Sequence, residues 1–186
     1  MDYSRFIKDL KKTTEQFFET CSENLDQAID LLSDSLTSGH KILIFGNGGS
    51  ASQSQHFAAE LINKFLKARS PLAAISLTTD TSALTSIAND ISFNLVFSRQ
   101  IEALGRKGDV AIGLSTSGSS PNIISAFESA KKNGLKTIAI TGNGGGELAA
   151  VCDYLLDVPS SATPRIQEVH LLILHIMAEE IEKKLC

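Results

Sequence analysis

The sequence predicts an α/β protein whose parallel β-sheet is covered by helices on both faces. Five short apolar runs alternate with segments that repeat their apolar residues at helical spacing. Runs that are apolar throughout are typical of strands buried between two layers of helices. In folds of this class, ligands bind beyond the carboxyl ends of the strands, near the point where the strand order reverses. The order of the strands cannot be predicted from these patterns.

The first 38 residues predict a long amphipathic helix, or two helices in series. Their apolar residues recur mostly at steps of three, four or seven, which places them on one helix face. Gly39 ends the segment. One small sheet is not expected to cover so wide an apolar stripe, so we expect this helix to contribute to an oligomer.

The remaining elements follow in strict alternation. The expected strands are 41–45, 72–77, 109–114, 135–141 and 153–158. Helices are expected at about 50–66, in the stretches after Asp80, at 122–133, briefly at 147–150, and at 165–185. Because no repeat, linker or low-complexity stretch interrupts this pattern, we expect one domain over 1–186, with 1–38 as a helical segment and 39–186 as the core.

The composition disfavours several classes of function. The net charge is −4 and no basic run is interleaved with aromatic residues, so nucleic acid is not expected as a partner. No stretch approaches the roughly 20 apolar residues of a membrane helix, and residues 1–12 lack a signal-peptide core. We therefore expect a cytoplasmic protein. Three scattered cysteines fit reduced thiols better than a disulfide framework or a zinc motif.

Two turns between an expected strand and helix suit the binding of an anion. GNGGS, residues 46–50, offers glycine amides at a helix N-terminus, although it matches neither the Walker loop nor the dinucleotide fingerprint. STSGSSPN, residues 115–122, offers five hydroxyls, more than one helix cap requires. Tight turns and helix capping explain each loop alone, but the pair favours phosphate binding.

Two helices also carry candidate groups for chemistry. His56 and Glu60 are four residues apart and share a helix face, so they suit a metal site, an acid–base pair or a solvated surface pair. On the last helix, Gln167 and His175 are eight residues apart, about 80° around the axis, and can face one cleft. His170 lies about 140° from His175 and points elsewhere.

Together these motifs resemble the phosphoheptose isomerases of the sugar isomerase (SIS) domain superfamily. GNGGSA, QHFAAEL, LTTDTSALTSIAND, RQIEALGRKGDV, STSG-SPN and RIQEVHLLILHI occur in this order and spacing. The resemblance runs roughly from residue 39 to residue 182. It implies a single SIS domain with a five-stranded parallel sheet in a flavodoxin-like three-layer arrangement, and usually a homotetramer.

The resemblance also implies a reaction and its residues. The family converts sedoheptulose 7-phosphate to D-glycero-D-manno-heptose 7-phosphate, the first step toward the heptose of bacterial lipopolysaccharide and of some capsules. It implies one zinc ion per subunit, bound by His56, Glu60, Gln167 and His175, and an acid–base pair of Glu60 and His175. The implied substrate contacts are Asn47, Gly48, Gly49, Ser50, Glu60, Asn89, Asp90, Ser115, Thr116, Ser117, Ser120 and Gln167.

The sequence departs from the family pattern at a few positions. Gln53 stands where an acidic residue is frequent, Lys64 where arginine is common, and Ser119 where asparagine is frequent. TGNGGG, residues 141–146, is richer in glycine than the usual turn. None of these departures removes a proposed catalytic group.

Two other functions remain possible for a chain of this pattern. A related SIS protein binds the bacterial replication initiator DnaA without isomerase chemistry, but it lacks the counterparts of Glu60 and His175, which are present here. An SIS isomerase for another sugar phosphate is the other alternative. Generic SIS domains do not carry QHFAAEL and RIQEVHLLILH together, so the phosphoheptose isomerase is the favoured prediction.

Overall fold

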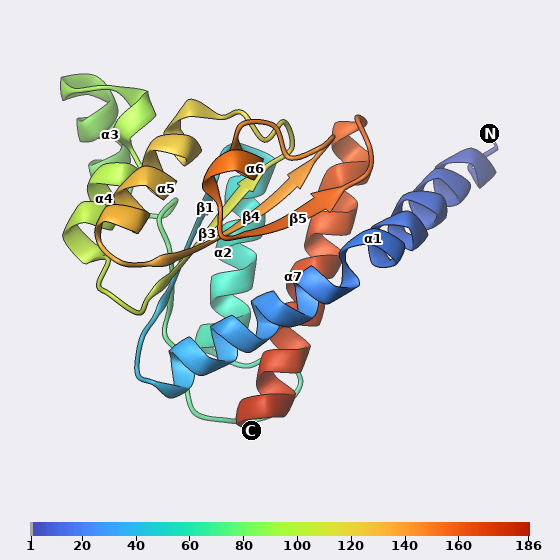
Figure 1. Ribbon diagram of the computed structural model, residues 1–186, viewed down its shortest axis with the longest axis horizontal. Helices are drawn as coiled ribbons and strands as arrows, with labels where there is room; N and C mark the ends of the chain where they lie inside the picture. The colour runs from blue at the N-terminus through green and yellow to red at the C-terminus, as the bar shows by residue number, and fades with distance from the viewer. Residues whose placement is uncertain (1) are drawn as a thin grey trace.

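At the centre of the protein lies a five-stranded parallel sheet, described over residues 2–186 by a computed structural model (Figure 1). Its strands are β1 (Ile42–Gly46), β2 (Ala74–Ser76), β3 (Val110–Ser115), β4 (Lys136–Gly142) and β5 (Tyr154–Val158). The spatial order is β2-β1-β3-β4-β5. The chain therefore moves to one side after β1 and to the other after β3, so the loops that follow these two neighbouring strands flank the switch point.

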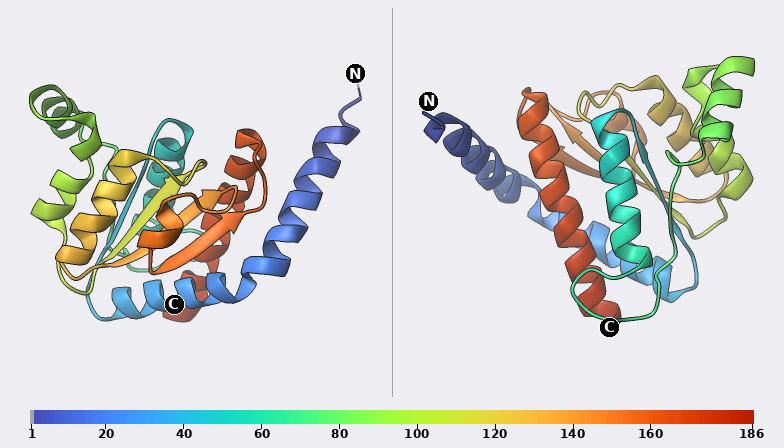
Figure 2. Two further views of the ribbon diagram at one scale, coloured as in Figure 1. Left: turned by 45° about the horizontal axis from the view of Figure 1, so that its top comes forward. Right: turned by 180° about the vertical axis from the view of Figure 1, so that it is seen from behind.

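Helices cover both faces of this sheet (Figures 1 and 2). The helices on one face are α1 (Ser4–Thr37), α2 (Gly49–Ile62) and α7 (Thr163–Leu185). Those on the other are α4 (Ser98–Leu104), α5 (Pro121–Lys132) and α6 (Leu148–Val151), with the short 3₁₀ helix η1 (Phe93–Leu95) and α3 (Thr81–Asp90) beside them. This is the predicted α/β three-layer architecture.

Two apolar cores follow from the alternation of side chains along the strands. On β1, Ile42 and Ile44 face the core beneath α1, α2 and α7, whereas Leu43 and Phe45 face the core beneath α4 and α5. All four side chains are fully buried. A strand between two helical layers must be apolar at every position, which is why β1 lacks the alternation of a half-exposed strand.

The N-terminal segment forms one continuous helix rather than two. From Thr13 onward α1 buries side chains against α7 and β5, while its first two turns extend beyond the sheet (Figures 1 and 2). Phe6 and Ile7 on this extension are largely exposed. Within residues 2–186, none of the helices is both long enough and apolar enough to cross a membrane.

Two predicted boundaries were wrong for structural reasons. The strand expected at 72–77 is only Ala74–Ser76, because the amide of Leu72 donates to Leu61 of α2 rather than to the sheet, and β2 is an edge strand. The helix expected to reach residue 66 ends at Ile62, because the amides of residues 65–67 donate to a carboxylate of α7 instead of continuing the helix.

Candidate active site

The loop after β1 forms the first half of the candidate site. Gly48 has a φ of 56°, which favours glycine, and α2 begins at the next residue. The amides of Gly48 and Gly49 donate to no acceptor among the described residues. Gly46 lies beside Leu114 in the sheet register, which brings this loop next to the one after β3. These amides at a helix N-terminus suit an anion.

The loop after β3 gathers three hydroxyls at the start of α5. The Oγ of Ser115 lies 2.9 Å from the Oγ of Ser120 and 3.4 Å from the Oγ of Ser117. The amide of Gly118 donates to the Ser115 hydroxyl at 3.1 Å and fixes the turn. Ser120 is the N-cap residue of α5, yet its side chain caps no helix amide. Hydroxyls arranged in this way can donate to phosphate oxygens.

A pair of side-chain amides joins the two loops. Asn47 and Asn122 exchange two hydrogen bonds of 3.0 and 2.9 Å, and Asn122 is almost fully buried at the start of α5. Because the Asn47 amide is occupied in this way, Asn47 serves to hold the loops together. Asn122 was not predicted as a site residue, since a single asparagine after proline gives no local sign of its partner 75 positions away.

The glycine-rich turn at the end of β4, residues 141–146, packs against the serine loop of residues 115–120. A Cβ added to Gly118 would lie 2.1 Å from the carbonyl oxygen of Gly145, and one on Gly146 would lie 2.6 Å from the Ser119 hydroxyl. The amide of Leu148 donates to the Gly118 carbonyl at 2.9 Å. Close packing of one backbone on the other therefore favours glycine at positions 118 and 146.

The predicted acid–base groups converge between α2 and α7, which lie side by side (Figure 2, right). The Nε2 atom of His56 lies 2.9 Å from Nε2 of His175 and 3.4 Å from a carboxylate oxygen of Glu60. The Phe65 ring packs on His175 with 5.7 Å between ring centres. His56 is largely exposed, and Glu60 and His175 are partly buried, so an incoming ligand can reach this cluster.

Gln167 lies nearer to the first loop than to the histidines. A Cβ added to Gly49 would lie 2.6 Å from its Nε2 atom, so glycine at this position lets the Gln167 side chain approach the start of α2. The side-chain amide of Gln53 donates to the backbone carbonyl oxygen of Gln167 at 2.6 Å, which joins α2 to α7. No contact recorded for the described residues joins Gln167 to His56, Glu60 or His175.

Asn89 and Asp90 lie apart from these groups. They are exposed at the end of α3, hydrogen-bond to each other, and belong to a helix that buries none of its residues (Figures 1 and 2). The described chain does not bring them to the loops or to Glu60. Their predicted contact with substrate stays a prediction.

His170 points away from the His56–His175 contact, as its angular position on α7 predicted, and has a structural role. Its ring is fully buried, and Nε2 donates to the Thr141 carbonyl at 2.9 Å. Burial lowers the pKa of the imidazole to about 4, against a smaller opposing effect of the bond to Thr141. The ring is therefore neutral at physiological pH.

The donors at the α2–α7 contact suit a zinc ion chemically. Two imidazoles and a carboxylate form a common catalytic zinc set. Ligands bound at tetrahedral angles to one zinc lie about 3.3 Å apart, close to the 2.9 and 3.4 Å that separate His56 from His175 and Glu60. As the side chains stand, no three His, Cys, Asp or Glu residues among those described are arranged to hold a metal. The two pairwise distances are compatible with zinc, but these three side chains do not form a complete ligand set in this arrangement.

Comparison with known proteins decides the family. The profile of the SIS domain family matches residues 5–142. The chain belongs to the SIS domain family and, within it, to the phosphoheptose isomerases. It is 51% identical to a phosphoheptose isomerase of Helicobacter pylori (strain P12) over 173 residues, 93% of this chain and 90% of that one. It is 49% identical to that of Aliarcobacter butzleri over 98% of both chains.

Solved structures of this family agree with the fold. The phosphoheptose isomerase of Neisseria gonorrhoeae superposes with a TM-score of 0.92 at 44% identity, covering 97% of this chain and 96% of that one. The enzyme from Francisella tularensis gives a TM-score of 0.93 at 35% identity with the same coverage. The predicted family and fold class are therefore confirmed.

Proposed function

We propose that this SIS-domain protein isomerises sedoheptulose 7-phosphate to D-glycero-D-manno-heptose 7-phosphate, the first step of bacterial heptose biosynthesis. The observation that carries the proposal is a cluster in which His56 contacts both Glu60 of the same helix and His175 of α7. The helix that bears His56 and Glu60 begins at the glycine loop after β1. The membership of the chain among the phosphoheptose isomerases supports it.

The two loops bind the phosphate end of the substrate. Glycine amides of residues 48–49 and the hydroxyls of Ser115, Ser117 and Ser120 converge from two neighbouring strands. Glu60 is eleven residues beyond Gly49, about 16 Å along α2. The Glu60 side chain leans back toward the start of α2, which shortens the distance that the open-chain sugar phosphate must span between the loops and the carboxylate. The carbonyl end of the sugar would then lie beside Glu60 while its phosphate occupies the loops.

The isomerisation moves a proton between neighbouring carbons through an enediol. The Glu60 carboxylate removes the proton from the carbon beside the carbonyl and returns it to the former carbonyl carbon. His175 transfers the proton between the two oxygens and assists ring opening. The imidazole of His56, within 3.4 Å of Glu60, orients that carboxylate.

We further propose that the site holds one zinc ion, with His56, Glu60 and His175 as ligands and Gln167 as a fourth. When bound, the ion would polarise the substrate carbonyl and stabilise the negative charge that develops on it. A carboxylate held tightly by zinc is a weaker base, so Glu60 must exchange one role for the other during turnover. Titration of purified protein with zinc, followed by calorimetry, tests the ion independently of activity. A His56→Ala variant with unchanged affinity would contradict this ligand set.

The reaction itself is tested by incubation with sedoheptulose 7-phosphate, with product followed by phosphorus NMR. We expect conversion by the wild type, loss of conversion in a Glu60→Gln variant, and loss in the presence of a chelator. No conversion, even with added zinc, would favour a sugar-phosphate-binding or protein-binding SIS domain, including the type that associates with DnaA. Conversion of a hexose or pentose phosphate alone would favour the other isomerase alternative.

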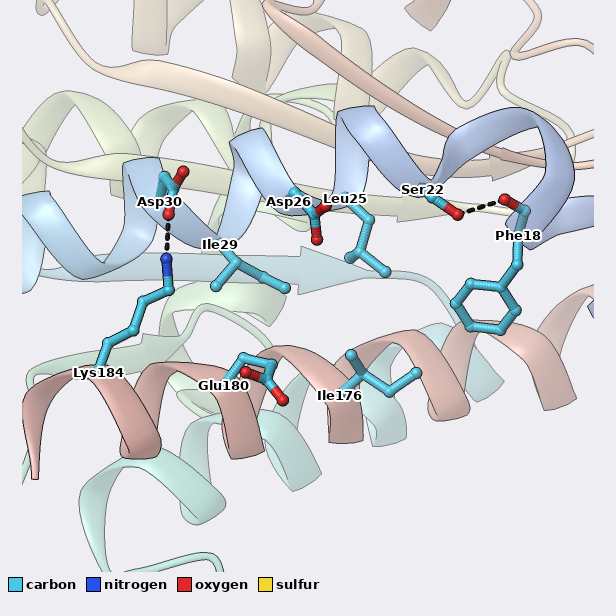
Figure 3. Close-up of a pocket in the computed structure, with 9 residues that line it drawn as sticks. All are labelled: Phe18, Ser22, Leu25, Asp26, Ile29, Asp30, Ile176, Glu180 and Lys184. Atoms are coloured by element: carbon cyan, nitrogen blue, oxygen red, sulfur yellow. Dashed lines mark hydrogen bonds and ion pairs between the residues drawn. The ribbon is translucent and has the colours of Figure 1, made fainter.

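We also propose a homotetramer that uses the N-terminal segment 1–38. A groove of about 470 Å³ runs between α1 and α7, with an apolar floor of Leu25, Ile29 and Ile176 (Figure 3). Acidic side chains, including Asp26 and Glu180, line its sides. The exposed first turns of α1 carry apolar side chains among several lysines and an arginine, so their charge is opposite to that of the groove. A second copy of this helix end matches the groove in both respects.

The proposed location is the cytoplasm, where sugar phosphates are made. The three cysteines are free, which suits a reducing compartment. Fractionation of cells that express a tagged chain tests the location directly.

A further inference from the structure

A buried ion pair lies below the proposed catalytic groups, at the far end of the α2–α7 contact. Glu182 on α7 and Arg69 in the segment after α2 are joined by a bond of 3.0 Å from Nε to the carboxylate. Their side chains are only 2% and 3% exposed. An ion pair so deeply buried is costly to form unless further hydrogen bonds satisfy it, so its partners indicate what it holds in place.

The Glu182 carboxylate binds three consecutive backbone amides. One oxygen accepts from Phe65 at 3.0 Å, and the other accepts from Leu66 and Lys67 at 2.8 Å each. Burial alone would raise the pKa of Glu182, but these amides and Arg69 hold it at about 2, so the carboxylate stays charged. The segment that leaves α2 is therefore fixed to α7 through its own backbone.

The Arg69 guanidinium binds the end of the helix that carries Glu60. It donates to the carbonyl oxygens of Glu60 and Leu61, each at 2.8 Å, and to that of Ser70 at 3.1 Å. The last carbonyls of a helix have no partners within it, and this one side chain binds two of them at the C-terminus of α2. The backbone of Glu60 itself is thus tied to the ion pair.

The same segment reaches His175. Phe65, whose amide is bound by Glu182, places its ring on the His175 imidazole. His175 and Glu182 are seven residues apart, nearly two turns or about 10 Å along one face of α7. One ion pair therefore contacts the helix end of the proposed base and the loop that packs on the proposed acid.

We propose that Glu182 and Arg69 are positioning residues that fix Glu60 and His175 relative to each other. This inference rests on the proposed isomerase function for its kinetic consequences, but its structural consequence does not depend on that function. Neither residue touches the substrate. Their loss should affect the chemical step more than the binding of the phosphate, because the phosphate loops lie at the opposite end of α2.

The test compares Glu182→Gln with Asp109→Asn. Asp109 is a matched control because it is also a buried carboxylate, bound by the amides of Lys41 and Arg106 and by the Lys41 side chain. It differs in position, because it precedes β3 and so lies at the amino ends of the strands, whereas the loops follow their carboxyl ends. Circular dichroism establishes that both variants are folded at the assay temperature. Steady-state kinetics and the ¹⁵N chemical shifts of the histidine rings are then measured for each.

We expect kcat to fall about tenfold or more in Glu182→Gln, with KM within about twofold of wild type. The ring resonances of His175 and His56 should shift in the same variant. Asp109→Asn should retain the wild-type kcat and ring resonances, although it too is destabilised. A folded Glu182→Gln with wild-type kcat and wild-type ring resonances would overturn the proposal.

Two further arms keep the result decisive. If wild type does not convert sedoheptulose 7-phosphate, the proposed function fails, and the ring resonances alone decide this inference. If Glu182→Gln does not fold, Phe65→Leu replaces it, because it keeps the amide that Glu182 binds and removes only the ring on His175. Phe65→Leu should shift the His175 resonance and lower kcat about threefold or more; wild-type values would overturn the proposal.

Discussion

Replacing Gly118 with alanine tests whether the serine loop depends on direct backbone contact with the glycine-rich turn. Gly118 has a φ of 66°, and an added Cβ would lie 2.1 Å from the Gly145 oxygen. Gly144 provides a matched control in that same turn. Its φ is 84°, yet an added Cβ there would meet nothing within 4 Å.

The expected cost has two parts. A left-handed backbone disfavours alanine by about 1–2 kcal/mol at both positions. At Gly118 the new methyl must also push apart two loops, and overpacking of this kind costs about 1–3 kcal/mol more. Gly144→Ala should therefore lose about 1–2 kcal/mol of unfolding free energy, and Gly118→Ala about 2–5 kcal/mol.

Urea unfolding at one fixed protein concentration measures these costs. With a slope of about 2 kcal/mol per molar urea, the two midpoints should differ by about 0.5–1.5 M. The KM for the sugar phosphate should rise in Gly118→Ala alone, because only that variant displaces the hydroxyls of residues 115–120. Equal midpoints and equal KM values would refute the argument that this contact shapes the phosphate loop.

Three other predictions follow from groups outside the reaction itself. Burial lowers the pKa of His170 in the folded protein to about 4, so as pH falls the unfolded chain takes up a proton before the folded protein does. The free energy of unfolding should therefore decline by about 3 kcal/mol as pH falls from 6.5 to 4. Urea midpoints measured over this pH range should show that decline in the wild type, and His170→Gln should lack the part due to this histidine. Asn122→Ala leaves Asn47 without its partner and should raise the KM for the sugar phosphate about tenfold with a smaller change in kcat, measured by steady-state kinetics. Ile7→Asp should reduce the oligomer measured by light scattering, whereas Leu104→Asp, also at an exposed apolar position, should not.

The regular parts of the protein were predictable because their patterns are local. The apolar runs predicted four of the strands to within one residue at each end. The helical periodicity predicted the lengths of α1 and α7 to within a few residues. Spacing also placed His56 beside Glu60 and separated His170 from His175. These relations depend only on the geometry of one helix or strand, which the sequence states directly.

What could not be predicted depends on partners that are distant in the chain. Asn47 and Asn122 are 75 positions apart, and Glu182 binds amides 115 to 117 positions before it. Backbone amides carry no sequence signal, so a carboxylate that binds three of them looks like any charged residue on a helix. The early end of α2 has the same cause, because it follows from Glu182 and not from the residues at that end.

The packing of α1 on α7 has a consequence for how the chain folds during synthesis. The sheet face formed by Ile44, Ile112 and Ile140 is covered in part by Val169, Ile173 and other residues of α7, which are translated after every strand. Until α7 leaves the ribosome, α1 can pack on this face only against β5, and part of the apolar surface of the strands remains accessible to other chains. A ribosome stalled before residue 163 should therefore hold a nascent chain that recruits chaperones, and release of the last helix should end that recruitment.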